Sequence, residues 1–249
     1  MTQLDGRTAI VTGGASGIGE ALVRRLVDAG AQVLAADLDA ARGAALAAAT
    51  GCSFRATDVA APAENEALVA TAVTELGGLD LAFLNAGILG RSIDDQRTGE
   101  PFDPAGLDPE AYRHTMAVNL DGVVFGVRAA VAAMERGAIV ATASVAGVMP
   151  WPPDPVYTVS KHGVVGFVRA VAPALEPVGI TINAICPGGV ATPLVGASPE
   201  SGLPLLHPDA VADAMLDAAT DGGTGRAITV VKGCDPVAQP LEFAPIPGF

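Results

Sequence analysis

Short, almost wholly apolar runs alternate with longer helical patterns along the chain, and this alternation limits the fold more than any other feature. Such runs are typical of parallel strands covered by helices on both faces of a sheet. Seven strands are predicted, over Thr8–Thr12, Gln32–Ala36, Ser53–Ala56, Asp80–Asn85, Ala138–Ser144, Thr181–Cys186 and Ala227–Val231. Six helices are predicted, over Ile18–Ala29, Ala40–Ala49, Pro62–Leu76, Pro109–Met134, Tyr157–Glu176 and Pro208–Ala219. The sequence therefore predicts an α/β, doubly wound, Rossmann-like seven-stranded parallel sheet with helices on both faces.

Three segments interrupt this alternation. Gly90–Asp108 is polar and predicts a long surface loop. Met149–Pro155 contains four prolines and the only tryptophan, which predicts a stiff, non-helical segment. Residues 236–249 are rich in proline and are interpreted as a C-terminal tail, either an extended arm packed on a neighbour or a disordered segment. Residues 1–235 are expected to form a single domain, since a chain of 249 residues is too short for two of ordinary size.

Composition restricts the possible partners. A formal net charge of -13 argues against nucleic acid and against an anionic membrane surface, because both select basic patches. There is no run of about 18 uncharged apolar residues and no signal-peptide pattern at the N-terminus, so a cytoplasmic protein is expected. The cysteines Cys52, Cys186 and Cys234 are odd in number and lack metal-ligand spacing. They are interpreted as free thiols in a reducing compartment, and no metal is predicted.

A glycine-rich turn joins the first predicted strand to the first helix. Gly13 permits the tight turn, Gly17 lets backbone amides approach a pyrophosphate, and Gly19 lets the helix pack close to the strand. Ser16 and Ile18 belong to the same turn. The free N–H groups and positive end of the helix dipole would then face phosphates. Its position between a strand and a helix makes this turn a predicted dinucleotide site.

Asp37 closes the second predicted strand. A carboxylate at this place can accept hydrogen bonds from the adenosine ribose hydroxyls and repels a 2′-phosphate. Neither Ser16, Leu38 nor Asp39 offers a cation to that phosphate. The cofactor is therefore predicted to be NAD rather than NADP.

Tyr157 and Lys161 stand four residues apart, on one face of a predicted helix. Ser144 ends the preceding strand, and Asn119 lies in the helix before it. With the Thr-Gly-x-x-x-Gly-x-Gly turn, these residues make the chain resemble the single-domain short-chain dehydrogenase/reductases of about 250 residues. The resemblance extends from Thr8 to about Pro193. It also rests on Asp58-Val59, Asn85-Ala86-Gly87 and Pro187-Gly188-Gly189-Val190-x-Thr192.

The resemblance implies hydride exchange between a nicotinamide and a secondary alcohol or its ketone. Tyr157 would be the catalytic base, and Ser144 would hold the substrate oxygen. Lys161 would bind the nicotinamide ribose, and Asn119 would hold a water that links Lys161 to solvent. The positive charges of Lys161 and of the oxidised nicotinamide are expected to lower the pKa of Tyr157. Further cofactor contacts are implied for Asp58, Val59, Asn85, Ala86, Gly87, Pro187, Gly188, Val190 and Thr192. A homodimer or homotetramer is also implied.

Three places depart from the family pattern. Leu84 replaces a common asparagine, which predicts a slightly changed loop. Pro173 predicts a kink or an end in the helix that begins near Tyr157. The segment Val195–His207 is short, which predicts an open substrate site.

Substrate contacts are expected beyond the carboxyl ends of the strands. Met149, Trp151, Val156 and Leu194 suggest an apolar wall suited to a steroid or lipid alcohol. The segment Val145–Gly166 also resembles, more weakly, hydroxyprostaglandin and hydroxysteroid dehydrogenases. A polyol dehydrogenase, an NADPH-dependent 3-ketoacyl-type reductase and a non-catalytic dinucleotide-sensing protein remain as alternatives.

Overall fold

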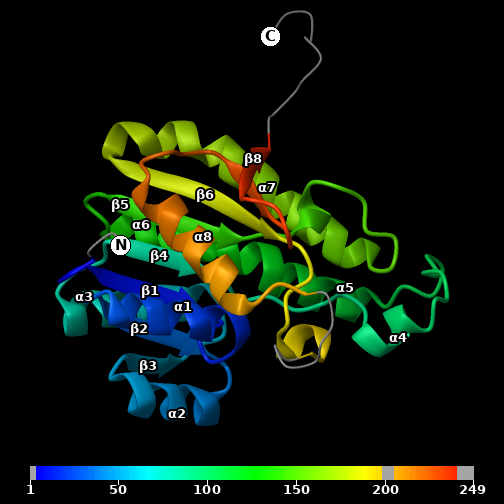
Figure 1. Cartoon of the computed structure of the whole chain (residues 1–249), viewed down its shortest axis with the longest axis horizontal. Helices are drawn as coiled ribbons and strands as arrows, with labels where there is room; N and C mark the ends of the chain where they lie inside the picture. Colours follow the sequence, from blue (N-terminus) through cyan, green and yellow to red (C-terminus); the bar gives the residue numbers. More distant parts are fainter. Residues whose placement is uncertain (1–3, 198–204, 240–249) are drawn as a thin grey trace, which may run out of the picture.

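The computed structural model describes residues 4–197 and 205–239, which form one eight-stranded sheet of order β3-β2-β1-β4-β5-β6-β7-β8 (Figure 1). The strands are β1 (Thr8–Thr12), β2 (Gln32–Asp37), β3 (Ser53–Ala56), β4 (Leu81–Leu84), β5 (Gly137–Thr142), β6 (Ile180–Pro187), β7 (Ala227–Val230) and β8 (Val237–Gln239). Strands β1 to β7 are parallel, and β8 is antiparallel to β7.

Helices cover both faces of this sheet. They are α1 (Gly17–Asp28), α2 (Ala40–Thr50), α3 (Pro62–Leu76), α4 (Ile93–Arg97), α5 (Pro109–Met116), α6 (Gly122–Ala133), α7 (Pro155–Leu175) and α8 (Pro208–Thr220). The short turns are η1 (Ala117–Asp121), which is π-helical, and the 3-10 turns η2 (Val145–Gly147), η3 (Glu176–Val178) and η4 (Pro193–Val195).

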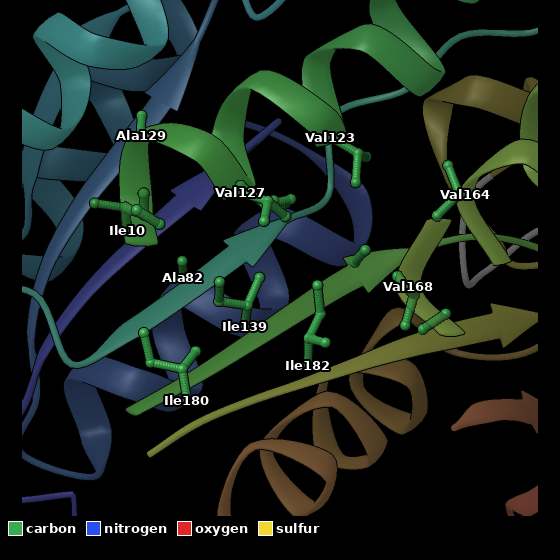
Figure 2. Packing of buried hydrophobic residues seen from close by; sticks show 14 of the residues in the cluster. Ile10, Ala82, Val123, Val127, Ala129, Ile139, Val164, Val168, Ile180 and Ile182 are labelled. Carbon is green, nitrogen blue, oxygen red and sulfur yellow. The ribbon is translucent and has the colours of Figure 1, made fainter. Parts of the chain in front are cut away.

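Alternating side chains of the strands build two apolar layers. On one face, Ile10, Ala82, Ile139 and Ile182 form one apolar layer with Val127 of α6 and Val168 of α7 (Figure 2). The opposite face buries its side chains against α1 and α8, which pack on each other. This burial on both faces explains why the strands are apolar throughout.

The strand order reverses beside β1. Strand β1 pairs with β2 on one side and with β4 on the other, so the connections that leave β1 and β4 diverge to opposite sides. Such a reversal leaves a crevice at the carboxyl ends of the strands. The arrowheads of these strands point towards the side on which α4 and α5 lie (Figure 1).

All seven predicted strands and six helical regions are present, with shifts of a few residues at their ends. The predicted count of seven strands misses β8, which adds Val237–Gln239 from the predicted tail to the sheet. Residues 240–249 of that tail, and part of the predicted open segment Val195–His207, lie outside the described residues. The fold is otherwise the predicted doubly wound sheet.

The structure differs in detail from the predictions at three places. The loop Gly90–Asp108 contains a helix, α4, whose first turn Ser92 caps by accepting a hydrogen bond from the Asp95 amide. Helix α7 runs through Pro173 and ends two residues later, at Leu175, so the predicted end is displaced by two residues. The predicted helix Pro109–Met134 is present as one helical stretch, Pro109–Ala133, in which the turn η1 is π-helical.

One stretch, Pro109–Ala133, is long and apolar enough to cross a membrane by length and composition, with a mean hydropathy of 1.5. Val123 and Val127 of this stretch lie in the core on the sheet (Figure 2). Core helices commonly meet the same test, so this stretch is weak support for a membrane span.

Candidate active site

A cleft of about 430 Å³ lies at the carboxyl ends of the parallel strands. Most of the predicted site residues line it: Gly13, Ser16, Gly17, Ile18, Asp37, Asp58, Val59, Asn85, Ala86, Gly87, Ser144, Trp151, Tyr157, Lys161, Pro187, Gly188, Val190, Thr192 and Leu194. Gly19, Asn119, Met149 and Val156 are not among the lining residues. The structure therefore brings together segments that lie far apart in the sequence, from Gly13 to Leu194.

The glycine turn is shaped for a close approach of backbone to a ligand. Gly13 and Gly17 have φ angles of 63° and 55°, a left-handed region that favours glycine. A Cβ on Gly13 would lie 2.9 Å from the Ala86 Cα, and one on Gly19 would lie 2.0 Å from the Gly13 carbonyl oxygen. Gly19 thus acts below the cleft, where it lets α1 pack against the turn.

Asp37 joins the glycine turn to the segment that follows β2. One carboxylate oxygen accepts a hydrogen bond of 3.0 Å from the Ala15 amide, and the other accepts one of 3.0 Å from the Asp39 amide. Arg42 forms an ion pair of 3.5 Å with Asp39. Asp58 lies nearby in the cleft and accepts a hydrogen bond from the Ala60 amide.

The segment after β4 is tied to β1 and β5. The Thr12 hydroxyl accepts hydrogen bonds from the Asn85 amide at 3.0 Å and from the Ala86 amide at 3.2 Å. The Asn85 side chain donates to the Gly13 carbonyl and accepts from the Thr142 hydroxyl at 3.0 Å. These bonds hold the floor of the cleft across three strands.

Tyr157 lies in the first turn of α7 and reaches the end of β5, where Ser144 begins η2. Burial raises the pKa of the Tyr157 phenol to about 12, and a hydrogen bond with the Ser144 side chain opposes this shift. The nearby Asp154 and Cys186 raise the pKa further. The predicted lowering of the Tyr157 pKa by Lys161 is not found in the chain by itself, where burial raises this pKa. The contribution of an oxidised nicotinamide stays a prediction.

Lys161 is only 2% exposed. Its ammonium donates a hydrogen bond of 2.8 Å to the Thr142 carbonyl and lies 5.5 Å from the centroid of the Tyr157 ring. Burial lowers the pKa of Lys161 to about 8. The ammonium is therefore close enough to the neutral form for its charge to respond to its surroundings near physiological pH.

Asn119 lies in the π-helical turn and is fully buried. Its side chain accepts a hydrogen bond of 2.8 Å from the Ile88 amide and donates to the Ile88 carbonyl at 2.9 Å and to the Ser160 hydroxyl at 3.0 Å. A Cβ on Gly87 would lie 3.3 Å from both the Asn119 Oδ1 and the Lys161 Nζ. Asn119 and Lys161 thus border the same space beside Gly87.

The segment after β6 closes the cleft over the glycine turn. Thr192 is buried, and its Cγ2 lies 2.9 Å from the position of a Cβ on Gly17. Val190 forms an isolated parallel bridge with Leu206, which fixes the backbone there. Thr192 thus lies against the glycine turn, and its contact with the nicotinamide carboxamide stays a prediction.

The apolar wall differs in part from the predicted one. Trp151 and Leu194 line the cleft, whereas Val156 is buried beside Gly90 and Met149 is 48% exposed away from the lining. The lining residues that sequence reasoning missed include Gln96, His114 and Val118. Gln96 was missed because it belongs to α4, inside a segment that reads as a loop.

The sequence profile of the family described as short chain dehydrogenase matches residues 7–201. Among curated proteins, sex determination protein tasselseed-2 of Zea mays is 41% identical over 217 residues, which cover 85% of this chain and 62% of that protein. The chain thus spans less than two thirds of the maize protein. A 2,5-dichloro-2,5-cyclohexadiene-1,4-diol dehydrogenase of Sphingobium indicum is 40% identical over 78% of this chain and 77% of its own length.

Two other similarities extend over almost the whole chain. Momilactone A synthase of Oryza sativa subsp. japonica is 35% identical over 97% of this chain and 94% of its own length. A crystal structure of 3-ketoacyl-(acyl-carrier-protein) reductase from Brucella melitensis, complexed with NADH, superposes with a TM-score of 0.82 at 28% identity. That superposition covers 91% of this chain and 97% of the reductase.

Proposed function

Because the chain belongs to the short-chain dehydrogenase family of oxidoreductases, we propose that it interconverts a secondary alcohol and a ketone with NAD as the cofactor. The observation that carries the proposal is the meeting of Ser144, Tyr157 and Lys161 in one cleft with the glycine turn. A hydroxyl, a phenol and an ammonium at one end of a dinucleotide channel are the groups that proton exchange with an alcohol requires.

The residues of the cleft fit a dinucleotide. At the glycines of the turn, a Cβ would collide with neighbouring backbone or with Thr192. Because these glycines have no side chain, a pyrophosphate could lie close to the backbone N–H groups of the turn. Asp37 would hold the adenosine ribose, Asp58 and Val59 the adenine, and Val190 and Thr192 the carboxamide. When bound, NAD supplies the acceptor for the hydride that leaves the alcohol carbon.

Tyr157 is proposed to take the hydroxyl proton during oxidation and to return it during reduction. Ser144 would donate a hydrogen bond to the substrate oxygen as charge develops on it. Lys161 would bind the nicotinamide ribose and favour the phenolate. Asn119, beside the same space at Gly87, would hold a water that connects Lys161 to solvent.

The substrate is proposed to be an apolar alcohol, such as a steroid or lipid alcohol. The support is the apolar side chains beyond Ser144 and Tyr157, contributed by Ile88, Leu89, Ile93, Trp151, Leu194 and Val195. A pocket of this kind gains affinity from burial of apolar surface. The name of the Sphingobium relative, a dehydrogenase of a cyclic diol, agrees with a ring-bound secondary alcohol.

A 3-ketoacyl-type reductase is a second candidate, favoured by the similarity to the Brucella structure. We further propose a homodimer or homotetramer in the cytoplasm, with a small alcohol or ketone as the partner and neither nucleic acid nor membrane. The net charge of -13 supports the exclusion of polyanions. Size-exclusion chromatography with light scattering measures the oligomeric state.

The proposed function is tested by reduction of NAD by the purified protein with steroid, lipid, cyclic and polyol alcohols. NADP, a 3-ketoacyl thioester with NADPH, and the variant Tyr157→Phe are run in parallel. Turnover of apolar alcohols with NAD, lost in Tyr157→Phe, is expected. Turnover of polyols alone contradicts the apolar substrate, NADPH-dependent reduction supports the reductase, and dinucleotide binding without turnover supports a sensing role.

A further inference from the structure

Asp154 is a buried acid, only 1% exposed, and lies three residues before Tyr157 at the start of α7. One of its carboxylate oxygens accepts a hydrogen bond of 3.0 Å from the Tyr157 amide. The other accepts hydrogen bonds from the Gly90 amide at 2.8 Å and the Arg91 amide at 2.9 Å. The Gln96 side-chain amide lies 3.4 Å from that second oxygen. One carboxylate therefore joins the catalytic helix to the segment that follows β4.

The chemistry of this cluster requires a carboxylate. All four partners are N–H donors, and an ionised carboxylate is the side chain that only accepts hydrogen bonds. An amide in its place would turn its own NH₂ group towards at least one of these donors. Hydrogen bonds to a charged acceptor are also stronger than neutral ones. Asp154 is thus matched to its surroundings by charge as well as by shape.

Gly90 shows how tightly the two segments approach. A Cβ at this position would lie 2.7 Å from the Asp154 Oδ1, 2.9 Å from the Val156 Cβ and 3.1 Å from the Tyr157 backbone nitrogen. The backbone of the segment therefore rests directly on the first turn of α7. Any larger residue at Gly90 would push the two apart.

The same segment carries part of the cleft wall. Gln96 in α4 donates to the Arg91 carbonyl at 2.9 Å, and its Oε1 accepts from the Trp151 indole at 3.3 Å. Arg97 donates to the Val195 carbonyl at 3.0 Å. Segment 90–97 thus links the walls contributed by Trp151 and Val195, and Asp154 links the segment to Tyr157.

We propose that Asp154 is a positioning residue that fixes the phenol of Tyr157 and the apolar wall of the cleft relative to each other. The inference rests on the proposed role of Tyr157 in proton transfer. A substrate held against the wall then presents its oxygen at a set distance from the phenol, and a displacement of about 1 Å is enough to lower the rate strongly. Loss of the carboxylate is expected to move the wall and the phenol independently.

The charge of Asp154 also acts on Tyr157. The titratable groups that face the phenol are Lys161 and Asp154 from α7 and Cys186 from β6, and the negative charge of Asp154 raises the pKa of the phenol. Removal of that charge lowers this pKa. The ionisation of the phenol therefore reports whether the charge of Asp154 reaches Tyr157, and the position of the wall needs a separate measurement.

The first test needs no substrate. The chain has two tyrosines, so ¹³C labelling of tyrosine Cζ gives two resonances, which Tyr157→Phe assigns. Asp154→Asn is expected to lower the pH at which Tyr157 ionises by about one unit. Asp108→Asn is the matched control, because Asp108 caps α5 in the same way at an exposed position. Equal ionisation of Tyr157 in both variants would overturn the electrostatic part of the proposal.

The second test follows the wall through Trp151, the only tryptophan of the chain. Acrylamide quenching of its fluorescence is expected to rise in both Asp154→Asn and Gly90→Ala, and to stay unchanged in Asp108→Asn. Gly90→Ala keeps the carboxylate, so it tests the contact even if Asp154→Asn fails to fold. Unchanged quenching in Gly90→Ala would overturn the coupling. Since both tests are independent of turnover, failure of the proposed alcohol oxidation would not be mistaken for failure of this inference.

Discussion

The ammonium of Lys161 lies 5.5 Å from the centroid of the Tyr157 ring and 2.8 Å from the carbonyl oxygen of Thr142. A ring face and a carbonyl replace only part of the hydration that an ammonium has in water. The pKa of Lys161 accordingly falls to about 8. Without a cofactor, the buried charge of Lys161 therefore lowers the stability of the fold. A bound ribose would offset this cost by accepting hydrogen bonds from the ammonium.

Lys161→Met is expected to abolish turnover and to raise the free energy of unfolding at pH 7 by about 1–2 kcal/mol. The folded pKa of about 8 lies below the ordinary value of 10.5, so the stability cost of Lys161 is complete below pH 8. It is relieved as the pH rises from about 8 to 10.5, because the folded protein loses the proton first. Urea unfolding at pH 7 and pH 9.5 measures the change, and the gain in the variant should be smaller at pH 9.5.

The control for this variant is Lys232→Met, since Lys232 is the other lysine and is exposed. Its free energy of unfolding should stay within about 0.5 kcal/mol of the parent protein. A stability gain in Lys161→Met that does not depend on pH would show that the added apolar packing, rather than the buried charge, is responsible.

Ser144→Ala is expected to lower kcat by about 10²–10³-fold, because a donor to the developing oxyanion is lost. The hydrogen bond from Ser144 also lowers the pKa of Tyr157, so its loss raises that pKa. Alcohol oxidation, which needs the phenolate, should then require a higher pH in the variant. Profiles of kcat against pH measure both effects, and an unchanged profile would show that the Ser144 hydroxyl does not act on the phenol.

Cofactor preference should follow the charge at the end of β2. The double variant Asp37→Ala with Leu38→Arg removes a carboxylate and adds a guanidinium for a 2′-phosphate. The ratio of kcat/KM for NAD to that for NADP is expected to fall by about 10–100-fold, the range of one or more charged hydrogen bonds. Asp39→Ser keeps a capping side chain on α2 and serves as the control for charge alone. Equal effects of both changes would contradict the assignment of the ribose to Asp37.

Gly19→Ala should prevent the glycine turn from closing. Its Cβ would lie 2.0 Å from the Gly13 carbonyl oxygen, so the turn must move, at a cost of about 1–3 kcal/mol and with loss of dinucleotide binding. Gly78→Ala is the matched control, because a Cβ there meets no atom within 4 Å. Thermal unfolding and isothermal titration with NAD measure stability and binding. Normal binding by Gly19→Ala would contradict the proposed pyrophosphate site.

The strands and long helices could be predicted because burial on both faces of the sheet requires a recognisable pattern of apolar residues in the sequence. Ile10 and Val11 point to opposite faces of β1, and each meets an apolar layer, so the run must be apolar throughout. The glycine turn was predictable for a similar reason: its backbone admits only small residues. The family resemblance brought Ser144, Tyr157 and Lys161 together, and in the structure all three lie in the connection between β5 and β6.

Features stabilised by tertiary contacts could not be predicted in this way. Helix α4 has five residues and no buried residue of its own, and it is held by Gln96 and Arg97 through hydrogen bonds to Trp151 and Val195. Strand β8 has three residues and depends on pairing with β7. The raised pKa of Tyr157 arises from burial that only the assembled site produces.

The closure of Thr192 over Gly17 has a consequence for biosynthesis. The glycine turn and Asp37 are synthesised early. Strand β1, however, can pair with β4 only after β4 has been synthesised. Thr192 can cover Gly17 only after β6 has paired with β5. A nascent chain that ends before β6 exposes one edge of β5, and one that ends before Thr192 leaves the glycine turn uncovered. If the proposed function holds, dinucleotide can stabilise this protein only late in synthesis, and the earlier intermediates must rely on their own apolar layers or on chaperones.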